Sequence, residues 1–258
     1  MNLSTLITVA ASLTFGMLAI WFWRKLAKQR EFEKKRDDSA HMMIHELRAP
    51  LTAIKDASEL MLSSTDALNA DEQGKLLHII DTQSKSLLDQ IGGILDTAKL
   101  EAGRFTVQKT MGDLRELIRE RIEFFTPQAQ HKKIAIKTDV VKTLPRVSFD
   151  EGRIAQVFNN LVSNSLKFTA SGGTITVSAR EDGRVLRLSV SDTGCGIPRE
   201  KQSQLFSKFY QINNPELGTG LGLYIVKGIV EAHGGWAEIG DAHDSGAVVR
   251  VFFPGEPV

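Results

Sequence analysis

The sequence has little cysteine and no excess of charge of either sign, and both absences exclude classes of protein. Cys195 is the one cysteine in 258 residues, so no internal disulfide can form. A lone thiol is typical of proteins in a reducing cytosol. The formal net charge is +1, so no overall field attracts nucleic acid or an acidic substrate. We therefore expect a cytosolic body with no direct binding to nucleic acid.

The sequence also lacks the phosphate-binding motifs of the commonest nucleotide-binding proteins. No G-x-x-x-x-G-K-[ST] stretch occurs, which excludes an ordinary P-loop. The stretch 218–223, GTGLGL, has the spacing G-x-G-x-G and not the G-x-G-x-x-G of dinucleotide-binding folds. A nucleotide therefore needs another kind of loop, and a glycine-rich backbone that opens a helix can hold phosphate.

Charged residues are missing from residues 3–23. At about 1.5 Å per residue, a helix of this length spans the roughly 30 Å hydrocarbon layer. The run ends in the aromatic cluster WFW, and the charged segment 24–38, RKLAKQREFEKKRDD, begins with basic residues. This order predicts a single-pass anchor in the inner (cytoplasmic) membrane, a helical linker over 24–38 and a cytoplasmic body. The alternative, a cleaved signal peptide, would carry basic residues before the apolar run, where only Met1 and Asn2 stand.

Residues 39–104 have the pattern of a helical hairpin. Two apolar series recur at alternating spacings of four and three, on either side of a turn in SSTDALNADEQG. The series are Ala40, Ile44, Leu47, Leu51, Ile54, Ser58 and Met61, then Leu77, Ile80, Ser84, Leu87, Ile91, Ile94 and Ala98. Two helices alone bury little, so we predict a homodimer that forms a four-helix bundle. Gly103 is expected to end the second helix.

Residues 110–256 mix helix and strand patterns, which predicts an α+β sandwich with its helices on one face of a sheet. Helices are expected in LRELIRERIEFF, in EGRIAQVFNNLVSNSLKF after the N-cap Asp150, and in LGLYIVKGIVEAHGG. Strands are expected in KIAIKTDV, TITVSAR, VLRLSVSD, WAEIG and AVVRVFF.

Polar residues in this domain form a candidate site for a nucleotide. Asn160 and Asn164 are four residues apart and share a helix face, with Lys167 one turn on. Amide oxygens suit a hard cation such as Mg²⁺, and the lysine can meet a phosphate. Asp192 follows a strand and can accept a hydrogen bond from the amine of adenine. Ordinary exposed asparagines and a tight glycine turn explain the same residues, so neither motif decides alone.

Order and spacing together are more specific than any one stretch. From about residue 38 onward, the chain resembles the histidine kinases of two-component signalling. Five motifs follow that family's order: HELRAPL resembles the H box, QVFNNLVSNSLKFT the N box, DTGCGIP the first glycine box, LFSKFYQ the F box and GTGLGL the second. The resemblance implies a dimerisation and phosphoacceptor hairpin followed by a Bergerat-type (GHKL) ATP-binding domain that uses ATP and Mg²⁺.

The resemblance also implies a role for each residue of the nucleotide site. Asn164 is the expected Mg²⁺ ligand, Asn160 and Lys167 contact the nucleotide or its phosphates, and Asp192 binds adenine. The further expected contacts are Gly194, Gly196, Phe209, Gly218, Thr219, Gly220, Gly222 and Leu223. Residues 198–217 are expected to form a mobile lid with Phe206 and Phe209 at its base, and Cys195 to pack in the pocket wall.

His45 is the expected phosphoacceptor. It follows Ile44 of the first apolar series, so its ring lies at the edge of the packed stripe and reaches solvent. A neutral imidazole nitrogen can attack the γ-phosphorus of ATP in line, and Glu46, which resembles the family's acidic partner, can hold the other ring N–H. The five other histidines are interpreted as surface residues. Pro50 leaves the carbonyl of Glu46 without its helical partner, so we expect a soft point that helps this helix move.

The implied function is an ATP-dependent kinase that phosphorylates His45 and passes the phosphoryl group to an aspartate of a response-regulator receiver domain. Two departures from the family pattern modify this expectation. Ala49 stands where the family usually has Thr or Asn, which predicts weak phosphatase activity towards the partner. The stretch before the second glycine box is NNPEL without a basic residue, and Lys208 is the nearest candidate for a lid cation.

Two other functions fit parts of the sequence. One is a non-enzymatic scaffold that binds nucleotide or a partner without transfer, and intact His45, Glu46, Asn164 and Asp192 argue against it. The other is an ATPase of the chaperone, topoisomerase or mismatch-repair type, and HELRAPL beside a membrane anchor argues against that. The signal enters through the anchor, the linker or a membrane partner.

Overall fold

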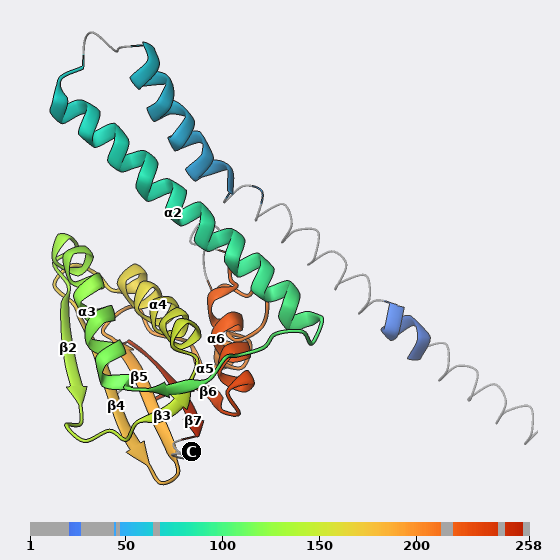
Figure 1. The fold of residues 1–258 in the computed structure, drawn as a ribbon. Helices are drawn as coiled ribbons and strands as arrows, with labels where there is room; N and C mark the ends of the chain where they lie inside the picture. Colours follow the sequence, from blue (N-terminus) through green and yellow to red (C-terminus); the bar gives the residue numbers. More distant parts are fainter. Residues whose placement is uncertain are drawn as a thin grey trace, which may run out of the picture. The chain divides into compact units, whose positions relative to one another are not determined.

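The computed structural model describes two units of the chain, residues 1–84 and 85–258, which we treat separately (Figure 1). The described residues are 21–26, 44, 47–63, 68–212, 219–241 and 246–254. Most of the predicted anchor (3–23) and linker (24–38) therefore lies outside the described residues. Among the residues that are described, no helix is long and apolar enough to cross a membrane.

A helical hairpin makes up most of the described part of the first unit, as the heptad-like spacing predicts. Residues 47–63 are helical and lie beside the beginning of α2 (Ala70–Glu101), and Pro50 does not interrupt its helix (Figure 1). Asn69 caps α2 reciprocally with Glu72: the Glu72 N–H donates to Asn69 Oδ1 at 2.9 Å, and the Asn69 N–H donates to Glu72 Oε2 at 3.0 Å.

Gly103 follows the end of α2, as predicted. Its φ is +62°, a conformation that glycine adopts at little cost. The Gly103 N–H donates to the Leu100 carbonyl at 3.1 Å, and the Arg104 N–H donates to the Lys99 carbonyl at 2.9 Å. These bonds use carbonyls that the helix end leaves without partners.

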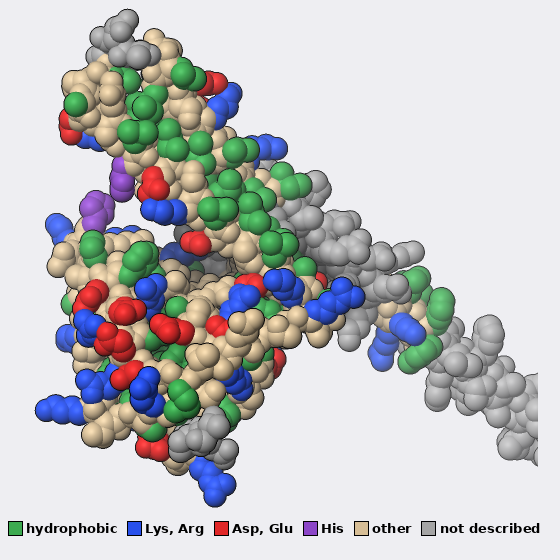
Figure 2. All heavy atoms as spheres, viewed as in Figure 1, with side chains coloured by type: hydrophobic (Ala, Val, Ile, Leu, Met, Phe, Trp, Pro, Cys, Tyr) green, Lys and Arg blue, Asp and Glu red, His purple; other side chains and the backbone are tan. Residues whose placement is uncertain are grey.

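Large apolar side chains remain exposed along the hairpin, where Figure 2 shows them as green groups. Several belong to the predicted seam: Ile44 is 54% exposed, Leu51 57%, Leu77 55% and Ile91 40%. A single chain therefore leaves much of this seam in contact with water.

The second unit contains a five-stranded sheet in the order β2-β4-β5-β7-β6. The strands are β2 (Ala135–Val140), β4 (Thr174–Asp182), β5 (Val185–Asp192), β6 (Trp236–Gly240) and β7 (Ala247–Pro254). β2 pairs with β4 in parallel, and the other pairs are antiparallel. Burial alternates along β4 and over the first residues of β5, so one face of the sheet is covered, as the period-two pattern predicts.

Helices cover that face (Figure 1). They are α3 (Leu114–His131), α4 (Glu151–Phe168) and α6 (Gly222–Ala232). The buried side of α4 includes Ile154, Phe158 and Leu161, which are at most 2% exposed. The predicted α+β sandwich is thus confirmed, and its core lies between these helices and the sheet.

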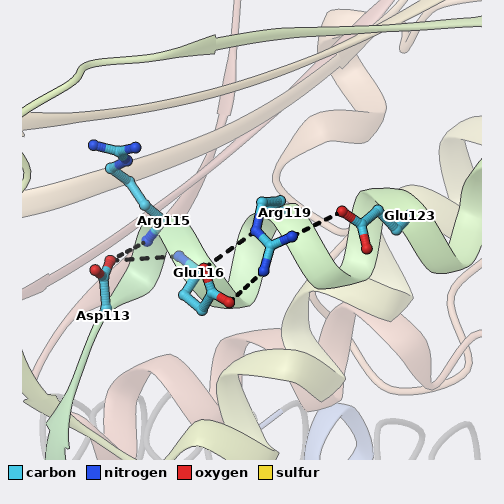
Figure 3. A network of polar contacts seen from close by, with 5 residues as sticks. All are labelled: Asp113, Arg115, Glu116, Arg119 and Glu123. Atoms are coloured by element: carbon cyan, nitrogen blue, oxygen red, sulfur yellow. Dashed lines mark hydrogen bonds and ion pairs between the residues drawn. The ribbon is translucent and has the colours of Figure 1, made fainter.

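The first turns of α3 carry a network of polar contacts (Figure 3). The Asp113 side chain caps the helix by accepting from the backbone N–H groups of Arg115 at 2.9 Å and Glu116 at 3.4 Å. Arg119 then pairs with both Glu116 and Glu123. The hydrogen bond from Arg119 lowers the pKa of Glu116. All three charged side chains are exposed, so this network contributes little to stability, and α3 depends on its buried face.

Three short elements of the second unit were not predicted from the sequence. β1 (Thr110–Gly112) and β3 (Val147–Phe149) pair as a separate antiparallel ribbon, and α5 (Arg199–Gln202) is one helical turn. α3 also continues beyond the predicted segment through Pro127.

His233 is buried, so its interpretation as a surface residue is wrong. It is 2% exposed at the end of α6, where its Nε2 accepts from the Asp150 backbone N–H at 3.0 Å and its Nδ1 lies 2.8 Å from the Ile229 carbonyl. Both contacts fit a neutral ring with its proton on Nδ1. Burial lowers the pKa of His233, which favours the same neutral form.

Candidate nucleotide-binding site

A cavity of about 390 Å³ opens in the second unit between α4, the residues after β5 and the beginning of α6. Nine of the predicted contact residues line it: Asn160, Asn164, Lys167, Asp192, Gly196, Thr219, Gly220, Gly222 and Leu223. Cys195 lines it as well, as predicted, and its thiol is exposed. The sequence motifs therefore converge on one place in the fold.

The pattern of α4 explains how its polar residues reach this cavity. Asp150 caps the helix by accepting from the Arg153 N–H at 3.1 Å, and the apolar positions that follow turn towards the sheet. Asn160 and Asn164 lie on the side that faces the cavity. The Asn160 side-chain amide donates to the Gln156 carbonyl at 3.0 Å, which leaves its Oδ1 as an acceptor towards α6.

Gly222 gives room for the asparagine side chains where α6 passes α4. A Cβ added there would lie 2.9 Å from Asn160 Oδ1 and 3.8 Å from Asn164 Nδ2. A side chain at this position would therefore displace Asn160, whereas glycine leaves both amides free to reach into the cavity.

Asp192 ends β5 with its carboxylate held by three donors. The backbone N–H groups of Gly194 and Ala247 donate to Oδ1 at 3.0 and 3.3 Å, and the Ser165 hydroxyl donates to Oδ2 at 3.0 Å. Gly194 does not line the cavity but allows this turn, because a Cβ there would lie 2.4 Å from the Phe168 carbonyl oxygen.

The second glycine box packs against the F box. Gly220 has φ +66°, and a Cβ there would lie 2.7 Å from the backbone of Phe209. The Phe209 N–H donates to the Gly220 carbonyl at 3.1 Å, and Phe209 itself has φ +62°. Phe209 therefore supports the loop and does not line the cavity.

Lys208, the nearest candidate for a lid cation, contacts α2 in this structure. Its ammonium lies 2.7 Å from Glu101 Oε1 and 4.6 Å from the centre of the Phe209 ring. It is not one of the residues that line the cavity.

Some predicted residues lie outside the described residues: His45, Glu46 and Gly218, together with part of the expected lid. Other cavity residues were missed by the sequence analysis, chiefly the apolar wall formed by Leu161, Phe168, Val190, Ile197, Leu205, Tyr210, Ile212 and Val249. The alternating pattern of β5 and β7 could have indicated that Val190 and Val249 face the cavity. No sequence pattern indicates that Ser165 and Ala247 line it.

The lining fits an adenine nucleotide with Mg²⁺ in its chemistry. The apolar wall suits a base, Asp192 offers an acceptor, and the amides of Asn160 and Asn164 offer oxygen ligands to a hard cation. In the described part of the chain, no group of three or more His, Cys, Asp or Glu residues could hold a metal. A Mg²⁺ ion held by asparagine amide oxygens would not need such a cluster of His, Cys, Asp or Glu residues.

Comparison with known proteins identifies two families in the chain. The model described as "Histidine kinase-, DNA gyrase B-, and HSP90-like ATPase" matches residues 149–257, and the "His Kinase A (phospho-acceptor) domain" matches residues 35–103. Among curated proteins, a sensor-like histidine kinase, R01002 of Rhizobium meliloti, is 35% identical over 82% of this chain and 41% of its own length. The chain spans about two fifths of the length of the first curated relatives that it matches.

Two solved structures are similar to the described fold. The catalytic domain of histidine kinase ThkA is 32% identical with a TM-score of 0.53, over 58% of this chain and 99% of that one. ThkA in complex with the response regulator protein TrrA is 26% identical with a TM-score of 0.60, over 89% of this chain and 66% of that one. With both family models present in the order that the motifs predict, the chain belongs to the sensor histidine kinases of two-component systems.

Proposed function

We propose that this chain is an ATP-dependent protein-histidine kinase that phosphorylates its own His45 and passes the phosphoryl group to an aspartate of a response-regulator receiver domain. One observation carries the proposal. A single cavity gathers two amide side chains, a carboxylate and a glycine-rich backbone, in a chain whose residues 35–103 match a phosphoacceptor family. The ThkA complex with TrrA supports the choice of partner.

Within this proposal, residues that line the cavity contact the nucleotide. Asn164 is the Mg²⁺ ligand, Asn160 and Lys167 contact the nucleotide or its phosphates, and Asp192 accepts from the adenine amine. Gly220, Gly222 and the residues beside them lie along the phosphates at the beginning of α6, where backbone N–H groups favour negative charge. When bound, Mg²⁺ would neutralise part of the negative charge on the β- and γ-phosphates.

Transfer requires one bond to form and one to break. A ring nitrogen of His45 attacks the γ-phosphorus in line as the bond from that phosphorus to the bridging oxygen breaks, and ADP leaves. Glu46 accepts the other ring N–H, which sets the tautomer and favours the positive charge that develops on the ring. Both residues lie outside the described residues, so these roles rest on the sequence.

We assign the remaining segments within the same proposal. Residues 39–104 dimerise into a four-helix bundle, and the exposed seam along the hairpin supports this because a second copy would remove it from water. Residues 110–256 bind ATP, residues 3–23 anchor the chain in the inner membrane, and residues 24–38 link the two. The input comes through the anchor, the linker or a membrane partner.

The test is transfer of label from γ-labelled ATP with Mg²⁺ to the full chain. Wild type should acquire label that is stable in base and labile in acid, as expected of phosphohistidine. His45→Gln should abolish it, whereas His78→Gln, a change at an exposed histidine of α2, should not. Absent label with retained ATP binding would favour a scaffold. ATP turnover that His45→Gln leaves unchanged would favour another ATPase of this superfamily.

A further inference from the structure

Ser165 is a buried hydroxyl inside the candidate nucleotide site. It lies on α4, one residue after Asn164, and is 5% exposed. Its Oγ lies 3.0 Å from Asp192 Oδ2, and both residues line the cavity. Since a carboxylate only accepts hydrogen bonds, the serine must be the donor in this contact.

The contact with Ser165 leaves a hydrogen-bond acceptor site open on Asp192. A carboxylate offers about four lone-pair sites, two on each oxygen. Oδ1 already accepts from the backbone N–H groups of Gly194 and Ala247. Oδ2 accepts from Ser165, so within the described part of the chain one of its sites stays open, on a side chain that lines the cavity.

The three donors also fix the plane of the carboxylate. The backbone donors come from the turn after β5 and from the beginning of β7, and both hold Oδ1. Among the described residues, Ser165 alone holds Oδ2, and it does so from α4. Without its hydroxyl, Oδ2 would have two open sites and no protein donor among these contacts.

We propose that Ser165 is a positioning residue for base selection, which directs the one open acceptor site of Asp192 at the exocyclic amine of a 6-aminopurine. The inference rests on the proposed function, because it needs a nucleotide in this cavity. A 6-oxopurine places a carbonyl oxygen opposite the carboxylate, where two acceptors face each other without a proton. A site built to accept from an N–H group discriminates strongly against such an analogue, because its buried polar group stays unpaired.

The test compares ATP with ITP, which carries an oxygen in place of the 6-amino group. Dissociation constants are measured by calorimetry with Mg²⁺ on the full chain in a His45→Gln background, so that the nucleotide is not consumed. Ser165→Ala should weaken ATP binding about tenfold and change ITP binding little, because ITP does not use the oriented site. The preference for ATP over ITP should therefore fall about tenfold.

Ser163→Ala is the matched control. Ser163 lies on the same helix and is exposed, and its hydroxyl donates to the Asn160 carbonyl at 3.3 Å. It should leave the ATP-to-ITP preference unchanged. Ser165→Thr retains a hydroxyl and should recover most of the preference, which a merely structural role of the serine would not predict.

The outcomes separate this inference from the proposed function. If the parent chain binds neither nucleotide, the proposed function fails. If the parent prefers ATP and Ser165→Ala keeps the full preference, or weakens ATP and ITP equally, the positioning role is wrong. Should Ser165→Ala not fold, Ser165→Cys decides: its weaker donor should reduce the preference several-fold, and an unchanged preference would overturn the inference.

Discussion

Replacement of Asp96 by alanine should destabilise the second unit. Asp96 lies near the end of α2, and its side chain is 7% exposed. Its Oδ2 accepts from Arg153 Nη1 at 2.6 Å and from Gln156 Nε2 at 2.8 Å, so it ties α2 to α4. Arg153 also donates to Gln156 Oε1 at 2.8 Å, which makes the three side chains one network.

The magnitude follows from the burial of the pair. Removing one partner of a buried ion pair costs about 3–5 kcal/mol, because the other charge is left without compensation. Arg153 is 28% exposed and can partly reach water, which places the cost near the lower value. Alanine regains about 0.5 kcal/mol of helix propensity, so the net loss is about 2.5 kcal/mol. For a chain of this size, that corresponds to a fall in Tm of about 5–10 °C.

The assay is thermal unfolding of the full chain, followed by circular dichroism, with Asp71→Ala as the control. Asp71 lies on the same helix and pairs with Lys75 at 2.6 Å, but the two side chains are 76% and 70% exposed. Loss of such an exposed pair should cost about 0.5 kcal/mol. A Tm for Asp96→Ala equal to that of Asp71→Ala would refute the assignment of this network as a stabilising link.

Three further predictions concern other parts of the chain. Burial lowers the pKa of His233 below the unfolded value of about 6.5, so the unfolded state binds the proton first as pH falls. The free energy of unfolding should therefore decrease between pH 7 and pH 5.5. The same pH series on His233→Gln should show a shallower slope. Because the methyl group of Ala49 cannot form a hydrogen bond that positions water, the purified chain with ADP should not accelerate dephosphorylation of the phosphorylated partner. Acceleration would contradict this. Pro50→Ala should change the ratio of kinase to reverse activity, measured with labelled nucleotide, and an unchanged ratio would count against a soft point in that helix.

Much of the fold could be predicted from the sequence where local pattern and burial agree. α4 and β5 have the predicted bounds because one has a strong helical stripe and the other alternates apolar and polar residues in its sequence. The ribbon of β1 and β3 could not be predicted, since three-residue strands carry too little periodicity. The parallel pairing of β2 with β4 depends on a crossover through α4 and leaves no local signal.

The candidate site could likewise be predicted from the sequence only in part. Asn160, Asn164 and Asp192 could be found because their motifs are contiguous in sequence. The donors that orient Asp192 could not, because Ala247 is 55 residues away and its contact uses a backbone N–H that any residue type would supply. His233 was misjudged because its partners, Asp150 and Ile229, define burial only once α4 and α6 have packed together.

The central claim is that the cavity lined by Asn164 delivers the γ-phosphoryl group of ATP to His45. Mass spectrometry at neutral pH, on the full chain after incubation with Mg²⁺ and ATP, tests this most directly because it locates the phosphoryl group. The account predicts phosphorylation at His45 in the wild type and none in Asn164→Ala. Phosphorylation at another residue, or at His45 to the same extent in Asn164→Ala, would contradict it.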